Sequence, residues 1–479
     1  MKNKLLGMAA LSLLLSAFVF LPLAPVWADS VDEKIKSLEQ ELTRLKGEQM
    51  ELKKEATAAV AQLPTFSLRP RSGVTIAAAD RSWAVTMFMQ FQMHMYNFID
   101  GNDRRGLTTG DLFNRRSRPG WTLCVMDCLY EWHQTWDIDT GDIGNNQNNG
   151  LYMNFSKINP WLPDILVADE ESVTSYNQVA RSSTSSAQLE LASDLLTDSG
   201  VSNLSRRTIE FGWLDKPVGP GSVTFAVAYR VGAGITENVA TDTDRKEFVA
   251  ILGVRPFVRT KNKWLERTRL GISTTLNRVD SRSAVQGDRL RIRTDERIGR
   301  LTLLDANNVG DGKHHNIQGG LEWGVGPYLI RGEAGYTKYH SGQVGAASSA
   351  VSDVRGSYWR IGNELFLWSP KGLLTGGAYQ PGSVQIGWGF QRAWADCGKF
   401  KECDPDQADF NNIRLLKREL DLWYYWNAFS RIGVIWNWWD ADNTPRNLQD
   451  AVGCVDNANR SVGKGCDWHS INIALQVYF

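Results

Sequence analysis

The chain has 479 residues, 42% of them hydrophobic, with 53 basic and 53 acidic residues. Zero net charge gives no global preference for nucleic acid. After the N-terminus, no uncharged apolar run approaches the ~20 residues of a membrane-spanning helix, which excludes a helical membrane protein. The 19 Trp, 18 Phe and 13 Tyr are typical of a β-barrel with aromatic girdles at both membrane interfaces, or of a soluble carbohydrate-binding β-protein.

Residues 1–28 have the pattern of an export signal. Lys2 and Lys4 form the basic start, Leu5 to Val19 the apolar stretch, and Val26-Trp27-Ala28 a small-residue cleavage site. No cysteine stands at that site, so a lipid anchor is not expected. Cleavage removes both lysines and leaves the mature chain slightly acidic.

Residues 29–56 are predicted to form a short coiled coil. Its apolar positions step by four and three in alternation, with charged residues between them. The repeat consists of Val31, Ile35, Leu38, Leu42, Leu45, Gln49 and Leu52. Two interpretations stay open, a periplasmic oligomerisation stalk or a single amphipathic helix that lies on its own domain. An Ala-, Pro- and Ser-containing linker is expected at 57–79.

Residues 80–479 follow a period of two, which predicts an all-β fold. Apolar residues at Phe225, Val227 and Tyr229 alternate with small or polar ones, and the same holds near 209–213, 270–276, 384–390 and 432–438. Tight turns such as 214–221 and 323–327 are separated by long polar stretches such as 281–312 and 395–412. Alternating short turns and long loops are typical of a transmembrane barrel. The length allows about sixteen antiparallel strands.

The last ten residues alternate without a break from Ser470 to the terminal aromatic Phe479. Such a strand would leave a free edge unless it pairs with the first strand. The sequence therefore predicts a closed barrel, with Phe479 as an assembly signal and the bacterial outer membrane as its location.

Six cysteines are disulfide candidates in an oxidising envelope, in pairs suggested by their spacing. A tight turn around Asp127 could join the first two, and the other pairs stand in loop-like sequence. A metal site is the alternative, although no histidine stands at ligand spacing. The pairs are Cys124 with Cys128, Cys397 with Cys403, and Cys454 with Cys466.

The densest group of basic residues is Arg289-Leu-Arg-Ile-Arg293, followed by Arg297. In an extended segment, Arg289, Arg291 and Arg293 share one face and form a ladder of guanidiniums for a mobile oxyanion. An exposed basic loop balanced by neighbouring carboxylates is the alternative. Six further arginines are expected on lumen faces, each balanced by a neighbour such as Glu333 or Glu364; they are Arg230, Arg267, Arg269, Arg331, Arg360 and Arg392.

The order of signal, coiled coil, linker, barrel and terminal phenylalanine resembles the phosphate/pyrophosphate-selective porin O/P family. The arginine run at 289–297 is similar to that family's pore-lining arginines, and Arg115 and Arg116 in Phe113-Asn-Arg-Arg-Ser117 to its paired eyelet arginines. Asn154-Phe155-Ser156-Lys157 loosely resembles a further family segment and adds Lys157 to the anion-binding set. The resemblance implies a trimer of sixteen-stranded barrels, each with an inward-folded constriction loop.

We therefore expect a passive porin for small hydrophilic solutes, with a preference for phosphate or other oxyanions. No cofactor or nucleic-acid partner is expected. None of the six histidines stands in a nucleophile motif, so no enzymatic activity is expected. The alternative function is a scaffold barrel that sheathes a partner such as a multihaem cytochrome. Whether residues 140–180 fold inward as a constriction distinguishes these two functions.

Overall fold

The structure is a computed structural model of the whole chain. It describes residues 28–69, 73–98, 111–136, 146–170, 196–197, 206–231, 246–279, 288–293, 302–309, 312–340, 354–369, 381–396, 413–442 and 466–478. These residues divide into a helical unit that ends at Leu63 and a β unit that begins at Pro64.

Helix α2 comprises Ala28–Gln62 and extends beyond the predicted end at residue 56. The extension is rich in alanine, which has the highest helix propensity, and Pro64 disfavours further helix at the residue before it. Apolar side chains of the predicted repeat, among them Ile35, Leu38, Leu42, Leu45 and Leu52, are exposed. No helix in the described part of the chain is long and apolar enough to cross a membrane.

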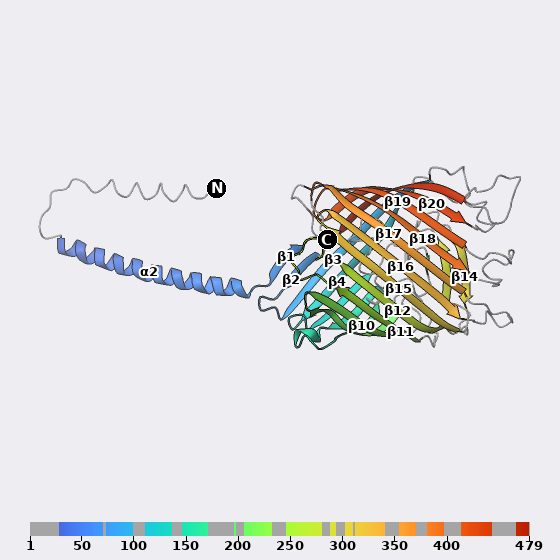
Figure 1. The fold of residues 1–479 in the computed structure, drawn as a ribbon. Helices are drawn as coiled ribbons and strands as arrows, with labels where there is room; N and C mark the ends of the chain where they lie inside the picture. The colour runs from blue at the N-terminus through green and yellow to red at the C-terminus, as the bar shows by residue number, and fades with distance from the viewer. Residues whose placement is uncertain are drawn as a thin grey trace. The chain divides into compact units, whose positions relative to one another are not determined.

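Sixteen antiparallel strands close into a barrel, as predicted. Each strand pairs with its neighbour around the ring, and the last strand, β21, pairs with the first barrel strand, β3 (Figure 1). The barrel strands are β3 (Trp83–Phe98), β4 (Asp111–Val125), β5 (Tyr130–Trp136), β6 (Asn146–Met153), β7 (Asp164–Glu170), β9 (Arg206–Val218), β10 (Gly221–Val231), β11 (Lys246–Arg255), β12 (Arg269–Val279), β15 (Gly312–Val325), β16 (Tyr328–His340), β17 (Val354–Trp368), β18 (Ser383–Asp396), β19 (Ile413–Tyr425), β20 (Ser430–Asp442) and β21 (Cys466–Tyr478).

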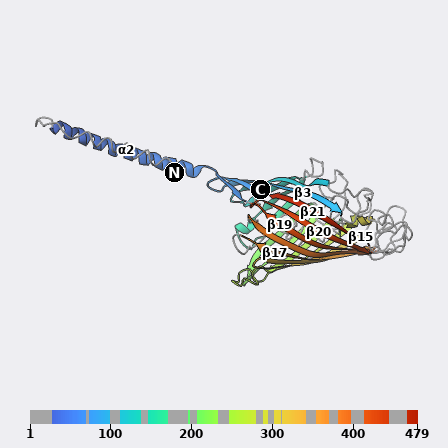
Figure 2. The ribbon, with the colours of Figure 1, turned by 90° about the horizontal axis from the view of Figure 1, so that it is seen from above.

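The connections alternate in length, which gives the barrel two different ends. Gly219–Pro220 and Gly326–Pro327 are two-residue turns at the end where β21 finishes, which we call the turn end. The connections at the opposite end, the loop end, include 171–205 and 280–311. Three turn-end connections are longer than expected, 154–163, 256–268 and 369–382. Figure 2 shows the strands side by side and tilted around the barrel.

The region predicted as a linker contains a β-hairpin, β1 (Thr65–Arg69) and β2 (Gly73–Ala77). β2 pairs with β3 at Ala84–Met87, while β21 pairs with the same strand further along, at Gln90–Phe98. The hairpin therefore continues the wall at the turn end, where β21 has already finished. Each strand of the hairpin has only five residues, and Pro, Arg and Ser residues stand between the two strands. Their alternation was therefore too short to be recognised in the sequence.

The outer face of the barrel is a continuous apolar surface. Strand register places apolar side chains side by side around the wall, and most of them are exposed. One such row crosses eight strands and begins on the hairpin: Phe66, Ile76, Val85, Leu123, Trp132, Leu151, Val167 and Ile209. The inner face carries mostly polar and charged side chains that are buried against the wall and one another. The predicted orientation, apolar outside and polar inside, agrees with this arrangement.

Candidate pore and its inner wall

A chain of polar side chains crosses the inner wall near the turn end, one from each of seven consecutive strands, β15 to β21. We call it the polar belt. Every member except the half-buried Glu322 is buried. Its members are Glu322, Arg331, Glu364, Gln385, Tyr425, Arg431 and Gln476.

Arg331 is the centre of the first half of the belt. Its Nε donates to Glu322 Oε2 at 2.9 Å, and its Nη1 donates to Glu364 Oε1. Gln385 Nε2 then donates to the second oxygen of Glu364 at 3.0 Å. One guanidinium thus lies between two carboxylates, which satisfies charges that would otherwise be costly to bury.

Arg431 is the centre of the second half. The hydroxyl of Tyr425 donates to Gln385 Oε1 at 2.5 Å and accepts from Arg431 Nη1 at 3.1 Å. Arg431 Nε donates to Gln476 Oε1 at 2.8 Å, so the belt reaches the closing strand β21. The Arg431 guanidinium also lies 4.0 Å above the ring of Trp423, a cation–π contact.

Glycines let large side chains lie flat against this wall. A Cβ added at Gly433 would come within 2.4 Å of the Trp423 ring, and one at Gly335 within 2.3 Å of Tyr358. A Cβ at Gly387 would come within 2.2 Å of the carboxylate of Asp421. The small residue on one strand therefore provides the space that the large residue on its neighbour occupies.

Several cations of the inner wall are matched by carboxylates. Arg230 lies 3.3 Å from Glu247, and Lys417 lies 2.5 Å from Glu419. Arg331 pairs with Glu364, which agrees with the expectation that a neighbouring carboxylate balances each of the further arginines. Arg392 differs from the expectation, because it alternates with the buried Gln391 and Ala393 and so lies on the outer face. These paired groups give the wall polarity without a large excess of positive charge.

A second, smaller sheet lies apart from the barrel wall. It contains β8 (Leu196–Thr197), β13 (Asp288–Arg293) and β14 (Thr302–Val309), with β13 in the middle. β13 approaches the barrel strands β18 and β19, and β8 approaches β17. Figure 1 shows β14 near the loop end, within the length of the barrel strands.

The wall beside β13 is apolar on its inner face. Ala393, Ala395 and Leu415 are at most 1% exposed there, whereas Phe390 and Leu420 on the outer face are 45% and 44% exposed. Inner-face residues of an open, water-filled barrel would contact solvent. Inner-face residues elsewhere, such as Ser470 and Asn472, are equally buried, so little of the inner wall is open to solvent, and β13 is the strand that approaches this stretch of β18 and β19.

The predicted anion-binding residues occupy three places. Arg289, Arg291 and Arg293 belong to β13, where Arg291 pairs with Thr197 and Asp305. Arg115 and Arg116 belong to β4, next to a register shift opposite Gln92 and Met93. The side chains of these five arginines, all of Arg297, and the terminal Phe479 lie outside the described residues.

Lys157 is at the turn end, not in a constriction. It ends the 3₁₀ helix η1 (Phe155–Lys157), which connects β6 and β7, and its Nζ donates to the carbonyl of Asp127 at 2.5 Å. Residues 146–170 of the region considered as a constriction are thus two wall strands and their turn-end connection. In the described residues, the strands that lie off the wall come from 196–197, 288–293 and 302–309.

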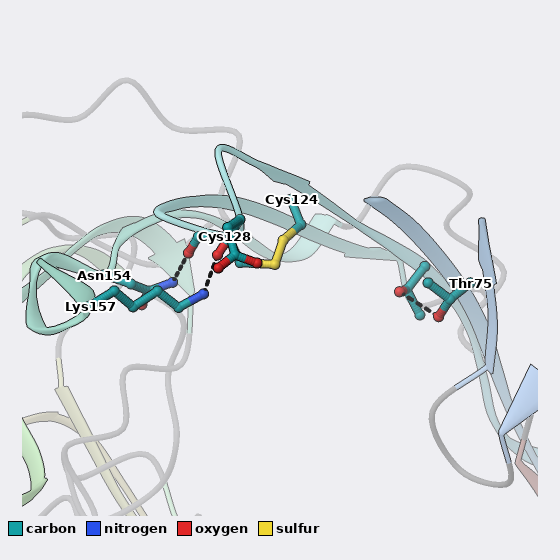
Figure 3. The surroundings of a disulfide bond; sticks show 7 residues. Thr75, Cys124, Cys128, Asn154 and Lys157 are labelled. Carbon is teal, nitrogen blue, oxygen red and sulfur yellow. Dashed lines mark hydrogen bonds between the residues drawn. A yellow bond between two sulfur atoms is a disulfide. The ribbon is translucent and has the colours of Figure 1, made fainter. Parts of the chain in front are cut away.

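Figure 3 shows Lys157 beside the disulfide of Cys124 and Cys128. This disulfide closes the β4–β5 turn, in which Met126, Asp127 and Cys128 all have positive φ angles between 54° and 59°. Such angles are unfavourable for side chains with a Cβ, so the turn needs external support. Asn154 provides part of it, because its Nδ2 donates to the Cys128 carbonyl at 2.7 Å.

The sequence suggested this pair because a tight turn at Asp127 could join the two cysteines. Cys397, Cys403 and Cys454 lie outside the described residues, and Cys466 is the first residue of β21. The sequence did not identify the polar belt. Its members were visible only as scattered polar residues, and their partners lie up to 45 positions away in the chain.

The chain is only distantly similar to proteins of known structure. No family model and no curated relative matches the chain. Among solved structures, the channel DcaP of Acinetobacter baumannii is 10% identical over 83% of this chain and 98% of its own, with a TM-score of 0.49. OprB of Pseudomonas putida is 8% identical over 82% and 94%, with a TM-score of 0.47. OmpF of Salmonella typhi is 8% identical over 83% and 98%, with a TM-score of 0.44.

Proposed function

We propose that the chain is a porin of the bacterial outer membrane, through which small hydrophilic solutes diffuse passively. The observation that carries the proposal is the closed sixteen-stranded barrel with an exposed apolar outer face and a polar inner face. A closed barrel satisfies all backbone hydrogen bonds within the wall, and its apolar exterior suits lipid. The export signal predicted at 1–28 supports the location.

We further propose that the pore prefers anions such as phosphate, because of the arginines on β13. The cations of the inner wall described above are paired, so a net positive field has to come from elsewhere in the lumen. β13 lies off the wall beside a buried apolar strip, and its sequence alternates arginine with Leu290 and Ile292. Packing the apolar residues against that strip would turn the arginines toward the open pore.

The paired arginines Arg115 and Arg116, with Arg297, complete the proposed anion-binding set; Lys157, at the turn end, is left out of it. A series of sites, none of which holds the ion too tightly, permits both binding and release. The scaffold alternative requires an unobstructed lumen, which a sheet beside β17, β18 and β19 does not favour.

The test is the reversal potential of single channels in planar bilayers under a salt gradient. The triple variant R289Q/R291Q/R293Q is compared with R259Q/K261Q/K263Q, which removes the same charge from an exposed turn-end segment. We expect the first triple to lower the anion-to-cation permeability ratio at least about twofold, because the binding sites in the pore are lost. Equal effects of the two triples would contradict the assignment to β13.

We also propose that α2 assembles the protein into a trimer through a periplasmic coiled coil. The supporting observation is the exposed apolar repeat at Ile35, Leu38, Leu42 and Leu45, a stripe that paired helices bury. The double variant L38D/L45D should reduce the trimer mass measured by light scattering in detergent, and an unchanged mass would contradict it.

A further inference from the structure

The turn-end connection between β11 and β12 is long and strongly basic. It runs from Pro256 to Thr268 and contains Arg259, Lys261, Lys263 and Arg267 with a single carboxylate, Glu266. The turn-end connections 219–220 and 326–327 join their strands with only two residues, so the extra length is not required to join β11 and β12.

Backbone hydrogen bonds hold the segment in a defined shape. The amide of Arg259 donates to the carbonyl of Pro220 at 3.0 Å. The side-chain oxygen of Asn262 accepts from the Trp264 amide at 3.0 Å. The backbone carbonyl of Asn262 accepts from the amides of Leu265 and Glu266. The Trp264 indole, 64% exposed, projects from this fixed turn.

Trp264 lies at the rim of the apolar outer face. Trp323 belongs to that face near the end of β15, and its indole Nε1 donates to the Trp264 carbonyl at 2.7 Å. Tryptophan is enriched where the hydrocarbon of a membrane meets its headgroups, because the ring is both apolar and polar. The segment thus stands at the level of the headgroups if the barrel spans a membrane.

The same turn occurs a second time. In Asn159-Pro-Trp-Leu162, the Trp161 amide donates to Asn159 Oδ1 at 3.0 Å, and the Trp161 carbonyl accepts from Trp213 Nε1 at 3.1 Å. Trp161 is 73% exposed. The connection that carries this copy, residues 154–163, contains one cation, Lys157, which already donates to the Asp127 carbonyl.

The two copies differ in charge. Arg259, Lys261 and Lys263 are exposed, and in the described part of the chain no carboxylate pairs with any of them. Neighbouring Arg255, in contrast, lies 3.7 Å from Asp215. Repetition of the turn indicates a shared role in placing an indole at the interface. The three cations give the copy that contains Trp264 a positive charge beside that indole.

We propose that residues 256–268 bind the headgroups of anionic phospholipids at the turn-end rim, with Arg259, Lys261 and Lys263 contacting phosphate and Trp264 in the interface. The inference rests on the barrel spanning a membrane, as proposed above, but not on the anion preference of the pore. Basic residues beside an apolar surface attract anionic lipid, each contributing about fivefold to the affinity.

The test uses the full-length protein in nonionic detergent micelles, titrated with dimyristoyl phosphatidylglycerol or dimyristoyl phosphatidylcholine. Bound lipid is counted by native mass spectrometry. We expect the wild type to retain phosphatidylglycerol in preference, and R259Q/K261Q/K263Q to bind it at least about tenfold more weakly. The matched triple R289Q/R291Q/R293Q should retain the lipid as the wild type does.

Three results would overturn the proposal: equal retention by the turn-end triple and the wild type, equal retention of the two lipids, or displacement of phosphatidylglycerol by millimolar inorganic phosphate, which would identify a site for the free ion. Channel conductance of the same preparations separates the two proposals. A protein that retains phosphatidylglycerol but forms no pore contradicts the porin function alone, and a conducting protein without lipid preference contradicts the lipid site alone.

Discussion

Two regions of the barrel wall are held together in different ways. Strands β15 to β21 are 13 to 15 residues long, and the polar belt ties them together on the inside. Strands β5, β6 and β7 have only seven or eight residues, and their turn end is held by the disulfide and by Asn154 and Lys157. Long strands are stabilised through buried side chains, whereas the short ones use a covalent bond and contacts at their connections.

The largest expected effect comes from removing the central cation of the belt. Arg331→Gln should lower the free energy of unfolding by about 3 kcal/mol, because Glu322 and Glu364 would be left as neighbouring carboxylates without a cation. Denaturant unfolding in detergent micelles measures the change.

Arg418→Gln is the matched control for that variant. Arg418 lies 4.0 Å from Asp440 on the outer face, where both side chains are partly exposed, so its loss should cost less than about 1 kcal/mol. If the two substitutions had the same effect, the belt would not stabilise the wall more than a surface ion pair does.

A smaller loss is expected at one of the tightly packed glycines of the inner wall. Gly433→Ala places a Cβ within 2.4 Å of the Trp423 ring and should cost about 2 kcal/mol, because the ring has to leave its flat position. A displaced indole would also narrow the lumen, so single-channel conductance should fall together with stability.

Gly212→Ala is the corresponding control on the inner face of β9. An added Cβ there meets no atom closer than 3.6 Å, so stability and conductance should stay close to those of the wild type. Equal tolerance of both alanines would show that the contact between Gly433 and Trp423 does not constrain the wall.

The comparison of the two parts of the wall also shows which features the sequence could predict. Alternation along β20 and β21 assigns Val434 and Ile473 to the outer face correctly, because period two is a local property of each strand. The number of strands followed from length and turn spacing. The partners of Arg331 and Arg431 depend on register between separate strands, which one sequence does not specify.

Other differences have similar physical causes. Lys157 stood in a segment similar to that of a known family, yet its position depends on η1 and on the Asp127 carbonyl across the turn end. Arg392 looked suitable for the lumen from its charge, but one step of register decides its face. The repeated Asn-x-Trp-Leu turns were readable in the sequence, but their shared hydrogen bonds with Trp213 and Trp323 were not.

The most local effect is expected in the region of short strands. Cys124→Ser/Cys128→Ser should lower the free energy of unfolding by about 2 kcal/mol, since a disulfide that closes so short a loop restricts the unfolded chain only modestly. The loss should be local: amide hydrogen exchange should quicken at residues 124–130 and 154–157, whose turns support each other, and stay unchanged along β15 to β21. Exchange that quickened equally in both regions would mean that the disulfide stabilises the whole barrel, and the distinction between the two parts of the wall would then be wrong.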